Sequence, residues 1–394
     1  MNVLVLQSEL GVLRGGGENF TRNLFEAFAA RGHRVAAAFT AGPAGGYPLP
    51  LPAAFEPIPV AGWWASNPGQ SALAWLSRRF GAECCRAQLE RIQEALSWRT
   101  YRWHCLRFQR AVEGLLARRC VEFDAIYVHG NPLLASRAAA VRPTVLRLPG
   151  PVGENVEPLL RRVHAVCANG DALARLRSLV GNHATELPIG IDLRTFHPGP
   201  SSVRARLGWG EQDCVVGYVG RLIQLKGADL LAAGFRRAAA EHPELKLLIV
   251  GSGNLEGHVS SVLAREIAAR RVHIEPGIDH EKLPEWYRAM DLIVMPSRYE
   301  NHSNALLEAM ACGVPFAASD VGGNRALAAT GAGWLFAPAS ENALADCVAR
   351  ATAARANLQA RGEAACRALA GHRGWSASAE RLEQILCSCL EPAR

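Results

Sequence analysis

The sequence predicts an α/β protein with two domains, each built on a doubly wound parallel sheet. Apolar runs of strand length alternate with helical stretches twice along the chain, which is the pattern of successive βαβ units. The chain has 394 residues, of which 49% are hydrophobic, and can therefore bury two cores of ordinary size. A stretch rich in turn residues at 188–200 separates the two series and predicts the linker between the domains.

The first series of strands lies in residues 1–190, which we expect to form the N-terminal domain. Its predicted strands are Val3–Leu6, Val35–Phe39, Ala125–Val128, Val145–Leu148 and Val163–Ala168. The opening segment MNVLVLQS is too short for a secretory signal and indicates a first strand. Residues 42–62 contain many Gly and Pro and predict a long irregular loop.

The second series lies in residues 191–375, which we expect to form the C-terminal domain. Its predicted strands are Val215–Val219, Leu245–Val250, Val272–Glu275, Leu292–Met295 and Phe316–Ser319. A final helix is predicted at 376–394. The longest apolar runs have strand length, whereas a membrane-spanning helix needs about 18 apolar residues. We therefore expect a protein that is soluble or peripheral to a membrane.

The charge of the chain is uneven, because the whole excess behind its net charge of +7 lies in residues 1–190. Ten arginines fall between Arg78 and Arg119, interleaved with tryptophans. Two interpretations stay open: a solvated helix face, or a surface at 78–119 that meets an anionic membrane or an acidic acceptor. No nucleic-acid-binding module accompanies the charge, so nucleic acid is not an expected partner.

The eleven cysteines are an odd number without the paired spacing of a metal site. This pattern favours reduced thiols in a cytoplasmic protein, without a structural zinc ion. The expected localisation is therefore cytoplasmic, with peripheral attachment to the cytoplasmic face of a membrane as an addition if the arginine-rich region binds lipid.

Two features of the first half follow strand ends. After strand Val3–Leu6, Gly16 and Gly17 precede a helix predicted from about Asn19. Glycines there let a backbone approach a ligand, and a helix N-terminus favours an anion such as phosphate, although a plain tight turn is an equal alternative. His129 ends strand Ala125–Val128, at the sheet edge where ligands bind, although lone histidines are more often structural.

In the second half, strand Val215–Val219 leads into Gly220, Arg221 and Lys226, followed by a helix from Asp229. Two cations at a strand end beside a helix N-terminus suit a diphosphate, with arginine as a fork and lysine as a point charge. The chain contains forty arginines and only three lysines, so a lysine at this place is a specific signal.

Strand Leu245–Val250 is followed by Gly251 and Gly253, which resemble the start of a dinucleotide fingerprint. A dehydrogenase is the function that such a fingerprint would indicate. The next glycine, Gly257, is one residue too far away, and the motif follows the second strand of its domain instead of the first. A dehydrogenase function would also give no role to Arg221 and Lys226, the cations that follow the preceding strand.

Glu300 and Glu308 follow strand Leu292–Met295, the first on a loop and the second inside a helix that Ser303 or Asn304 can cap. Carboxylates at this edge of a parallel sheet can accept hydrogen bonds from the vicinal hydroxyls of a sugar or a ribose. The alternative is a loop acid plus a solvated helix acid.

Together these motifs resemble the family-4 retaining glycosyltransferases of the GT-B fold, and the likeness runs nearly from end to end. The motifs that carry it are Gly15-Gly16-Gly17-Glu18, Leu187-Pro-x-Gly-Ile-Asp192, Gly220-Arg221 with Lys226-Gly227, Gly251-x-Gly253, Glu300 to Glu308-Ala-Met-Ala-Cys-Gly-x-Pro315, Gly322-Gly323 and Trp375-Ser376. The resemblance implies two Rossmann-like domains that face a cleft. It implies that 1–190 holds most acceptor contacts, that 191–375 binds the nucleotide sugar, and that the helix at 376–394 packs back on the N-terminal domain.

The resemblance also implies a role for each site residue. Arg221 and Lys226 would hold the diphosphate of the donor, Glu308 the ribose and Glu300 the transferred sugar. Further donor contacts would come from residues of both domains: Gly16, Gly17, Gly220, Gly251, Gly253, His302, Ser303 and Asn304. His129 would lie near the reacting carbon.

Fixed cations act where the leaving diphosphate gains negative charge, so we expect transfer without a metal or other cofactor. Retention is expected through attack on the same face, with Glu300 as a sugar clamp and not as a nucleophile. Asn301, His302 and Ser303 replace the glycine and aromatic residue usual in the family, so specificity for the sugar is expected to lie there.

The acceptor is left open by these motifs. A polysaccharide, lipid-linked glycan or glycoconjugate is one class, and a small soluble acceptor such as a secondary metabolite or a thiol is another. A nucleotide-sugar epimerase or hydrolase on the same fold, and a sugar-nucleotide binding module without activity, are the alternatives from other functional classes. No motif indicates an oligomeric state.

Overall fold

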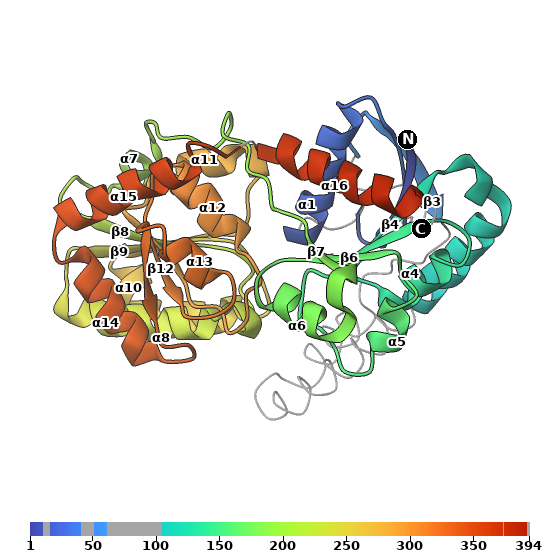
Figure 1. The fold of residues 1–394 in the computed structure, drawn as a ribbon. Coiled ribbons are helices and arrows are strands. Elements are labelled where there is room, and N and C mark those ends of the chain that lie inside the picture. The colour runs from blue at the N-terminus through green and yellow to red at the C-terminus, as the bar shows by residue number, and fades with distance from the viewer. Residues whose placement is uncertain (11–15, 41–50, 61–104, 373, 392–394) are drawn as a thin grey trace, which may run out of the picture. The chain divides into compact units, whose positions relative to one another are not determined.

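The computed structural model describes residues 1–10, 16–40, 51–60, 105–372 and 374–391 (Figure 1). They fall into two compact units. Unit 1 comprises Met1–Ala168, Arg175–Pro188 and Ser378–Arg394, and unit 2 comprises Asn169–Ala174 and Ile189–Ala377. Each unit contains one parallel sheet with helices around it, which confirms the fold class predicted from the sequence.

The sheet of unit 1 has seven strands in the order β3-β2-β1-β4-β5-β6-β7, and all its neighbouring pairs are parallel. The strands are β1 (Asn2–Leu6), β2 (Arg34–Thr40), β3 (Phe55–Val60), β4 (Ala125–His129), β5 (Thr144–Arg147), β6 (Ala165–Ala168) and β7 (Ala184–Glu186). The strand order reverses between β1 and β4. This switch point is where open α/β sheets bind their ligands.

Strand β3 corrects the prediction of an irregular loop over 42–62, because residues Phe55–Val60 pair in parallel with β2. Pro57 and Pro59 obscured this strand in the sequence. Proline lacks the N–H that a sheet needs, but β3 lies at the edge of the sheet. Residues two apart direct their backbone groups to the same side, so both prolines can face away from β2.

The helices between these strands cover the faces of the first sheet. They are α1 (Gly16–Ala29), a helix at 105–119, α4 (Pro132–Ala138), α5 (Glu157–Leu160) and α6 (Gly170–Val180), with short 3-10 turns at Cys120–Glu122 and Gly181–His183. Helix α1 buries Phe20, Leu24, Phe25 and Phe28 at helical spacing. It begins three residues before the predicted start at Asn19, so Gly16 and Gly17 belong to its first turn.

The sheet of unit 2 has six strands in the order β10-β9-β8-β11-β12-β13, again all parallel. The strands are β8 (Cys214–Val219), β9 (Leu245–Val250), β10 (Val272–Glu275), β11 (Leu292–Met295), β12 (Phe316–Ser319) and β13 (Gly333–Phe336). Its switch point lies between β8 and β11. Strands β7 and β13 are short additions to the strands predicted from sequence.

The second sheet is covered by α7 (Val203–Leu207), α8 (Ala228–Glu241), α9 (Glu256–Val262), α10 (Ala264–Ala268), α11 (Leu283–Tyr287), α12 (Asn304–Ala311), α13 (Asn324–Ala328), α14 (Glu341–Thr352) and α15 (Arg355–Leu369), with 3-10 turns at Gln224–Lys226 and His280–Lys282. Helices α8 and α14 pack their apolar faces on β8, β9 and each other in one buried cluster. Burial on both faces explains why the strands of this unit are almost wholly apolar.

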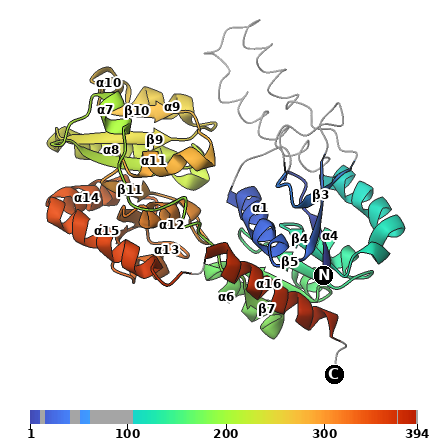
Figure 2. The same ribbon diagram turned by 90° about the horizontal axis from the view of Figure 1, so that it is seen from above.

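The last helix, α16, spans Gly374–Leu390, and its residues from Ser378 onward belong to unit 1. In Figures 1 and 2 this red helix lies among the blue and green elements of unit 1. Glu383 forms an ion pair with Arg31 at 2.6 Å, and its other carboxylate oxygen lies 3.2 Å from the ring of His33. Arg381 donates a hydrogen bond to Thr185 at 2.7 Å. These contacts and the buried face of Leu382 and Leu386 attach the helix to this unit.

In the described part of the chain, no helix is both long and apolar enough to cross a membrane. Most of the arginine-rich region at 78–119 lies outside the described residues. Its described end is the helix at 105–119, which exposes Arg107, Arg110 and Arg118. Binding of this region to a membrane stays a prediction.

Candidate functional site

The predicted site residues gather at the two switch points. In unit 1, Gly16 and Gly17 follow β1 and His129 ends β4, so both features lie where the strand order reverses. In unit 2, the segment Gly220–Lys226 follows β8 and the segment Pro296–Glu300 follows β11. Parallel strands end at the same edge of a sheet, and ligands of such folds bind outside that edge.

Lys226 and Glu300 form the central contact of the unit 2 site. The Nζ atom of Lys226 lies 2.6 Å from Oε2 of Glu300, although the residues are 74 positions apart. The Glu300 side chain is 9% exposed and the Lys226 side chain 26%. Burying two charges costs free energy, so a partly buried ion pair needs good geometry and further hydrogen bonds to persist. The contact therefore fixes a cation and a carboxylate side by side at the carboxyl edge of the sheet.

Backbone and side-chain contacts hold the loop that carries Glu300. Ser297 donates a hydrogen bond to Glu300 at 3.3 Å, and Ser319 at the end of β12 donates one to the Ser297 carbonyl at 2.5 Å. Arg298 makes two bonds of 2.7 Å to Asp229 at the start of α8. This bidentate pair ties the loop after β11 to the loop that carries Lys226.

Gly322 supports the same loop by its lack of a side chain. Its φ is +49°, and a Cβ atom there would overlap the carbonyl oxygen of Glu300. Its neighbour Gly323 donates its N–H to the Asn301 carbonyl at 3.1 Å. The Gly322-Gly323 motif therefore sets the position of Glu300 through backbone contact.

The substitution Gly322→Ala is expected to lower the free energy of unfolding by about 2–4 kcal/mol, because it adds backbone strain to a steric overlap. Urea denaturation of the variant measures this loss. Gly257→Ala on α9 is the matched control, since its added Cβ meets nothing within 4 Å, and it should be neutral or stabilising by up to about 1 kcal/mol. A Gly322→Ala protein as stable as the wild type would contradict the packing described here.

Glu308 lies in the middle of α12 and is 9% exposed. Its two carboxylate oxygens are held separately: the Tyr287 hydroxyl donates to Oε2 at 2.8 Å, and His280 Nε2 lies 2.9 Å from Oε1. Burial and the Glu308 charge raise the pKa of Tyr287 well above its ordinary value, so this hydroxyl stays protonated and donates. Each carboxylate oxygen keeps further capacity to accept a hydrogen bond.

The segment between the two glutamates forms the start of α12. Ser303 is the N-cap, because its side chain accepts the N–H of Leu306 at 3.3 Å, and Asn304 is the first helical residue. Of the two caps predicted from the sequence, Ser303 is therefore the one used. Asn301 accepts a hydrogen bond from Tyr299 at 2.8 Å, while the ring of His302 lies near Gly323.

Arg221 is exposed, and among the described residues its side chain makes no hydrogen bond with Lys226 or Glu300. Its backbone carbonyl accepts a hydrogen bond from Tyr218 at 2.8 Å. The glycines beside it have a packing role: a Cβ on Gly251 would overlap the Gly220 carbonyl, and one on Gly253 would overlap the Leu222 carbonyl. Their contact with a donor stays a prediction.

His129 and Gly17 lie together in unit 1. A Cβ on Gly17 would lie 2.9 Å from Nε2 of His129, and the Thr21 hydroxyl is 3.3 Å from Nδ1. Burial and the charge of Arg147 lower the pKa of His129 well below its ordinary value, so its imidazole is neutral at pH 7. A neutral ring can donate at one nitrogen and accept at the other.

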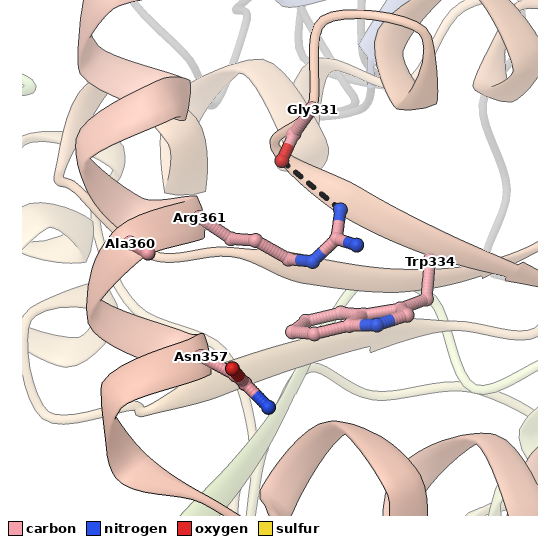
Figure 3. Close-up of a pocket in the computed structure, with 5 residues that line it drawn as sticks. All are labelled: Gly331, Trp334, Asn357, Ala360 and Arg361. Carbon is pink, nitrogen blue, oxygen red and sulfur yellow. Dashed lines mark hydrogen bonds between the residues drawn. The ribbon is translucent and has the colours of Figure 1, made fainter.

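One pocket in unit 2 lies away from these residues. Its volume is about 470 Å³, and Figure 3 shows the Arg361 side chain of α15 extending over the Trp334 ring, with Asn357 on the same helix. The Arg361 guanidinium lies 4.2 Å from the ring centroid and donates to the carbonyls of Gly331 and Gly333. This pocket adjoins the amino-terminal end of β13, opposite to the edge that carries the glutamates.

Sequence reasoning missed four residues that shape the unit 2 site. Tyr287 and His280 carry no motif, and only the fold brings them to Glu308. Asp229 and Arg298 are 69 positions apart and gave no sign of their pairing. In the described part of the chain, no group of three or more His, Cys, Asp or Glu side chains could hold a metal ion.

Comparison with known proteins finds sequence relatives for part of this chain. Residues 213–353 match the family model described as Glycosyl transferases group 1. D-inositol 3-phosphate glycosyltransferase 1 of Catenulispora acidiphila is 33% identical over 59% of this chain and 58% of its own length. The D-inositol 3-phosphate glycosyltransferase of Segniliparus rotundus is 32% identical over 49% and 47%. The matched segments thus span about half the length of these relatives.

Solved structures match almost the whole fold. Sucrose-phosphate synthase of Thermosynechococcus elongatus has a TM-score of 0.75 at 22% identity and covers 98% of both chains. HepE of Anabaena in complex with UDP-glucose has a TM-score of 0.70 at 19% identity, covering 98% of this chain and 100% of its own. These comparisons confirm the GT-B fold predicted from the sequence, and residues 213–353 match the glycosyl transferases group 1 domain.

Proposed function

We propose that this protein is a retaining glycosyltransferase that moves a sugar from a nucleoside diphosphate sugar to an acceptor hydroxyl without a metal. The observation that carries the proposal is the Lys226–Glu300 pair at the carboxyl edge of the second sheet. It supplies a cation for the leaving diphosphate and a carboxylate for the sugar hydroxyls, both fixed before the substrate binds. The group 1 domain at 213–353 contains both residues.

In this proposal each donor group has its own partner. The diphosphate takes Lys226 and Arg221, and competes with Glu300 for the Lys226 ammonium. The ribose hydroxyls donate to Glu308, whose oxygens are already oriented by His280 and Tyr287. Fixed groups of this kind stabilise charge in the transition state without reorganisation. Retention follows if the acceptor attacks the face from which the diphosphate leaves.

The proposal includes two alternative classes of acceptor. The sequence resemblance leads to a polysaccharide, a lipid-linked glycan or another glycoconjugate, with 78–119 as the surface that would meet a membrane. The name of the relatives, D-inositol 3-phosphate glycosyltransferase, supports a small soluble acceptor instead. Transfer assays with both kinds of acceptor separate these alternatives. Turnover of donor without any acceptor would indicate the epimerase or hydrolase alternative.

A donor panel tests the proposal directly. The full chain is heated with UDP-, GDP- and ADP-sugars, with UDP-glucose first because HepE binds it. A donor at 100 times its dissociation constant is expected to stabilise the protein by about 2.7 kcal/mol. The measurement is repeated with EDTA, which should leave the stabilisation unchanged. If no nucleotide sugar shifts the melting temperature, the proposed function is wrong.

A further inference from the structure

Arg147 is a buried cation at the carboxyl end of β5. It is the last residue of that strand and is 5% exposed. Among the described residues its side chain has no hydrogen bond or ion pair, and its buried Nε atom has no acceptor. A charged group without a partner is costly to bury, so an arginine kept in this state needs a reason beyond stability.

Among the residues that the structure describes, none supplies a charge that compensates Arg147. The ionisable groups that act on it are Tyr127 and Cys167. Burial raises the pKa of Cys167 to about 12 and that of Tyr127 far above its ordinary value, so both are neutral at pH 7. The carboxylate in the first turn of α1, Glu18, accepts a hydrogen bond from Gln7. The positive charge of Arg147 is therefore not neutralised by any described residue.

Three elements meet around this guanidinium. It lies 3.5 Å from the centroid of the Phe20 ring on α1, an attraction that leaves its N–H groups unused. His129 at the end of β4 pairs with Arg147 in the strand register. Gly17 in the first turn of α1 approaches the same imidazole. The 14-residue helix α1 thus begins beside the cation, and a helix N-terminus favours negative charge.

We propose that Arg147, His129 and the first turn of α1 form an oxyanion-binding site, and that it takes a phosphate or carboxylate group carried by the acceptor. A guanidinium presents parallel donors that match such a group in geometry. The assignment to the acceptor rests on the proposed function, because Arg221 and Lys226, the cations proposed for the donor diphosphate, both belong to unit 2. An uncharged acceptor would leave the buried guanidinium of Arg147 without a partner. The site therefore discriminates against uncharged acceptors.

The first test uses the full chain and measures binding calorimetrically with inorganic phosphate, glucose 6-phosphate, glucuronate and glucose. The wild type is expected to bind the three anionic probes and not glucose. Arg147→Met keeps the bulk of the side chain without the charge, and should weaken binding of the anions by about tenfold or more. Arg162→Met, at an exposed arginine of the same unit, is the matched control and should bind like the wild type.

Stability separates a ligand-binding arginine from a structural one. Without any anion, Arg147→Met is expected to melt at a higher temperature than the wild type, because it removes an unpaired buried charge. Glucose 6-phosphate should then raise the melting temperature of the wild type and not that of the variant. A variant that binds the anions as well as the wild type does, or a wild type that binds none, would overturn the proposal. If Arg147→Met does not fold, Arg147→Lys serves instead, with weaker anion binding as the expected result.

A binding experiment with the donor nucleotide shows whether the oxyanion at this site belongs to the acceptor or to the donor diphosphate. Binding of the nucleoside diphosphate from the best donor is measured for the same variants and should be unchanged by Arg147→Met. If the variant loses it together with glucose 6-phosphate, the site holds the donor diphosphate and the acceptor assignment is wrong. A protein that binds nucleotide sugars but no anionic probe refutes this inference alone, whereas one that binds anionic probes but no nucleotide sugar refutes the proposed function.

Discussion

The substitution Lys226→Ala is expected to lower kcat for sugar transfer by about 100- to 1,000-fold, the usual cost of removing one group that stabilises developing negative charge. The effect arises because the ammonium is fixed 2.6 Å from Glu300 at the place proposed for the leaving diphosphate. Steady-state kinetics with the donor found by the panel measure it. Lys246→Ala is the matched control, since Lys246 on β9 pairs with Asp213 before β8, and its loss should not affect transfer.

Loss of Lys226 also leaves the buried Glu300 carboxylate without its cation, so reduced stability could imitate reduced chemistry. The double variant Lys226→Ala/Glu300→Gln removes that charge and should recover much of the stability. Transfer should remain low in the double variant. Recovery of transfer along with stability would mean that Lys226 acts only as a structural partner of Glu300, and would contradict its proposed role.

The substitution Glu308→Ala is expected to weaken donor binding by about 10- to 100-fold, because hydrogen bonds to a charged group are worth about 1.5–3 kcal/mol. The loss should appear in KM more than in kcat, since a ribose is far from the bond that breaks. The variant also leaves the Tyr287 hydroxyl and the His280 ring without their acceptor. Tyr287→Phe, which removes one of these contacts and keeps the carboxylate, is the control for that structural effect.

A ligand change isolates the ribose contact. Calorimetry compares the nucleoside diphosphate of the best donor with its 2′-deoxy analogue in the wild type and in Glu308→Ala. The wild type should prefer the ribonucleotide, and the variant should bind both nearly equally. A preference that survives in the variant would show that Glu308 does not bind the 2′-hydroxyl, and would remove its proposed role.

The strands of both sheets could be predicted because most of them are buried on both faces and therefore nearly all apolar. Strand β3 could not, since Pro57 and Pro59 are tolerated only through its edge position, which depends on the neighbouring strand. Helix α1 starts at Gly16 instead of near Asn19, because glycine is a poor helix former whose place in a first turn is decided by contacts such as that with His129.

The candidate site was predictable in its residue types but not in its pairings. Lys226 was conspicuous because lysine is so rare here, and Glu300 and Glu308 followed a recognisable strand. Two ion pairs depend on loops that the strand order brings together. They join Lys226 with Glu300 and Arg298 with Asp229. Arg147 stood inside an apolar strand, which is a signal in itself, yet only the structure revealed that its charge has no partner among the described residues.

The sequence by itself determined the α/β class, the two sheets and the loops on which chemistry can occur, because strand and turn preferences act over a few neighbouring residues. Only the tertiary structure decided which of those groups face each other: the pair of Lys226 with Glu300, the two donors on Glu308, and the isolated charge of Arg147. The contacts of Lys226 and of Glu308 join residues 21 to 74 positions apart. They exist because parallel strands end at one edge of each sheet, and no local pattern encodes that meeting.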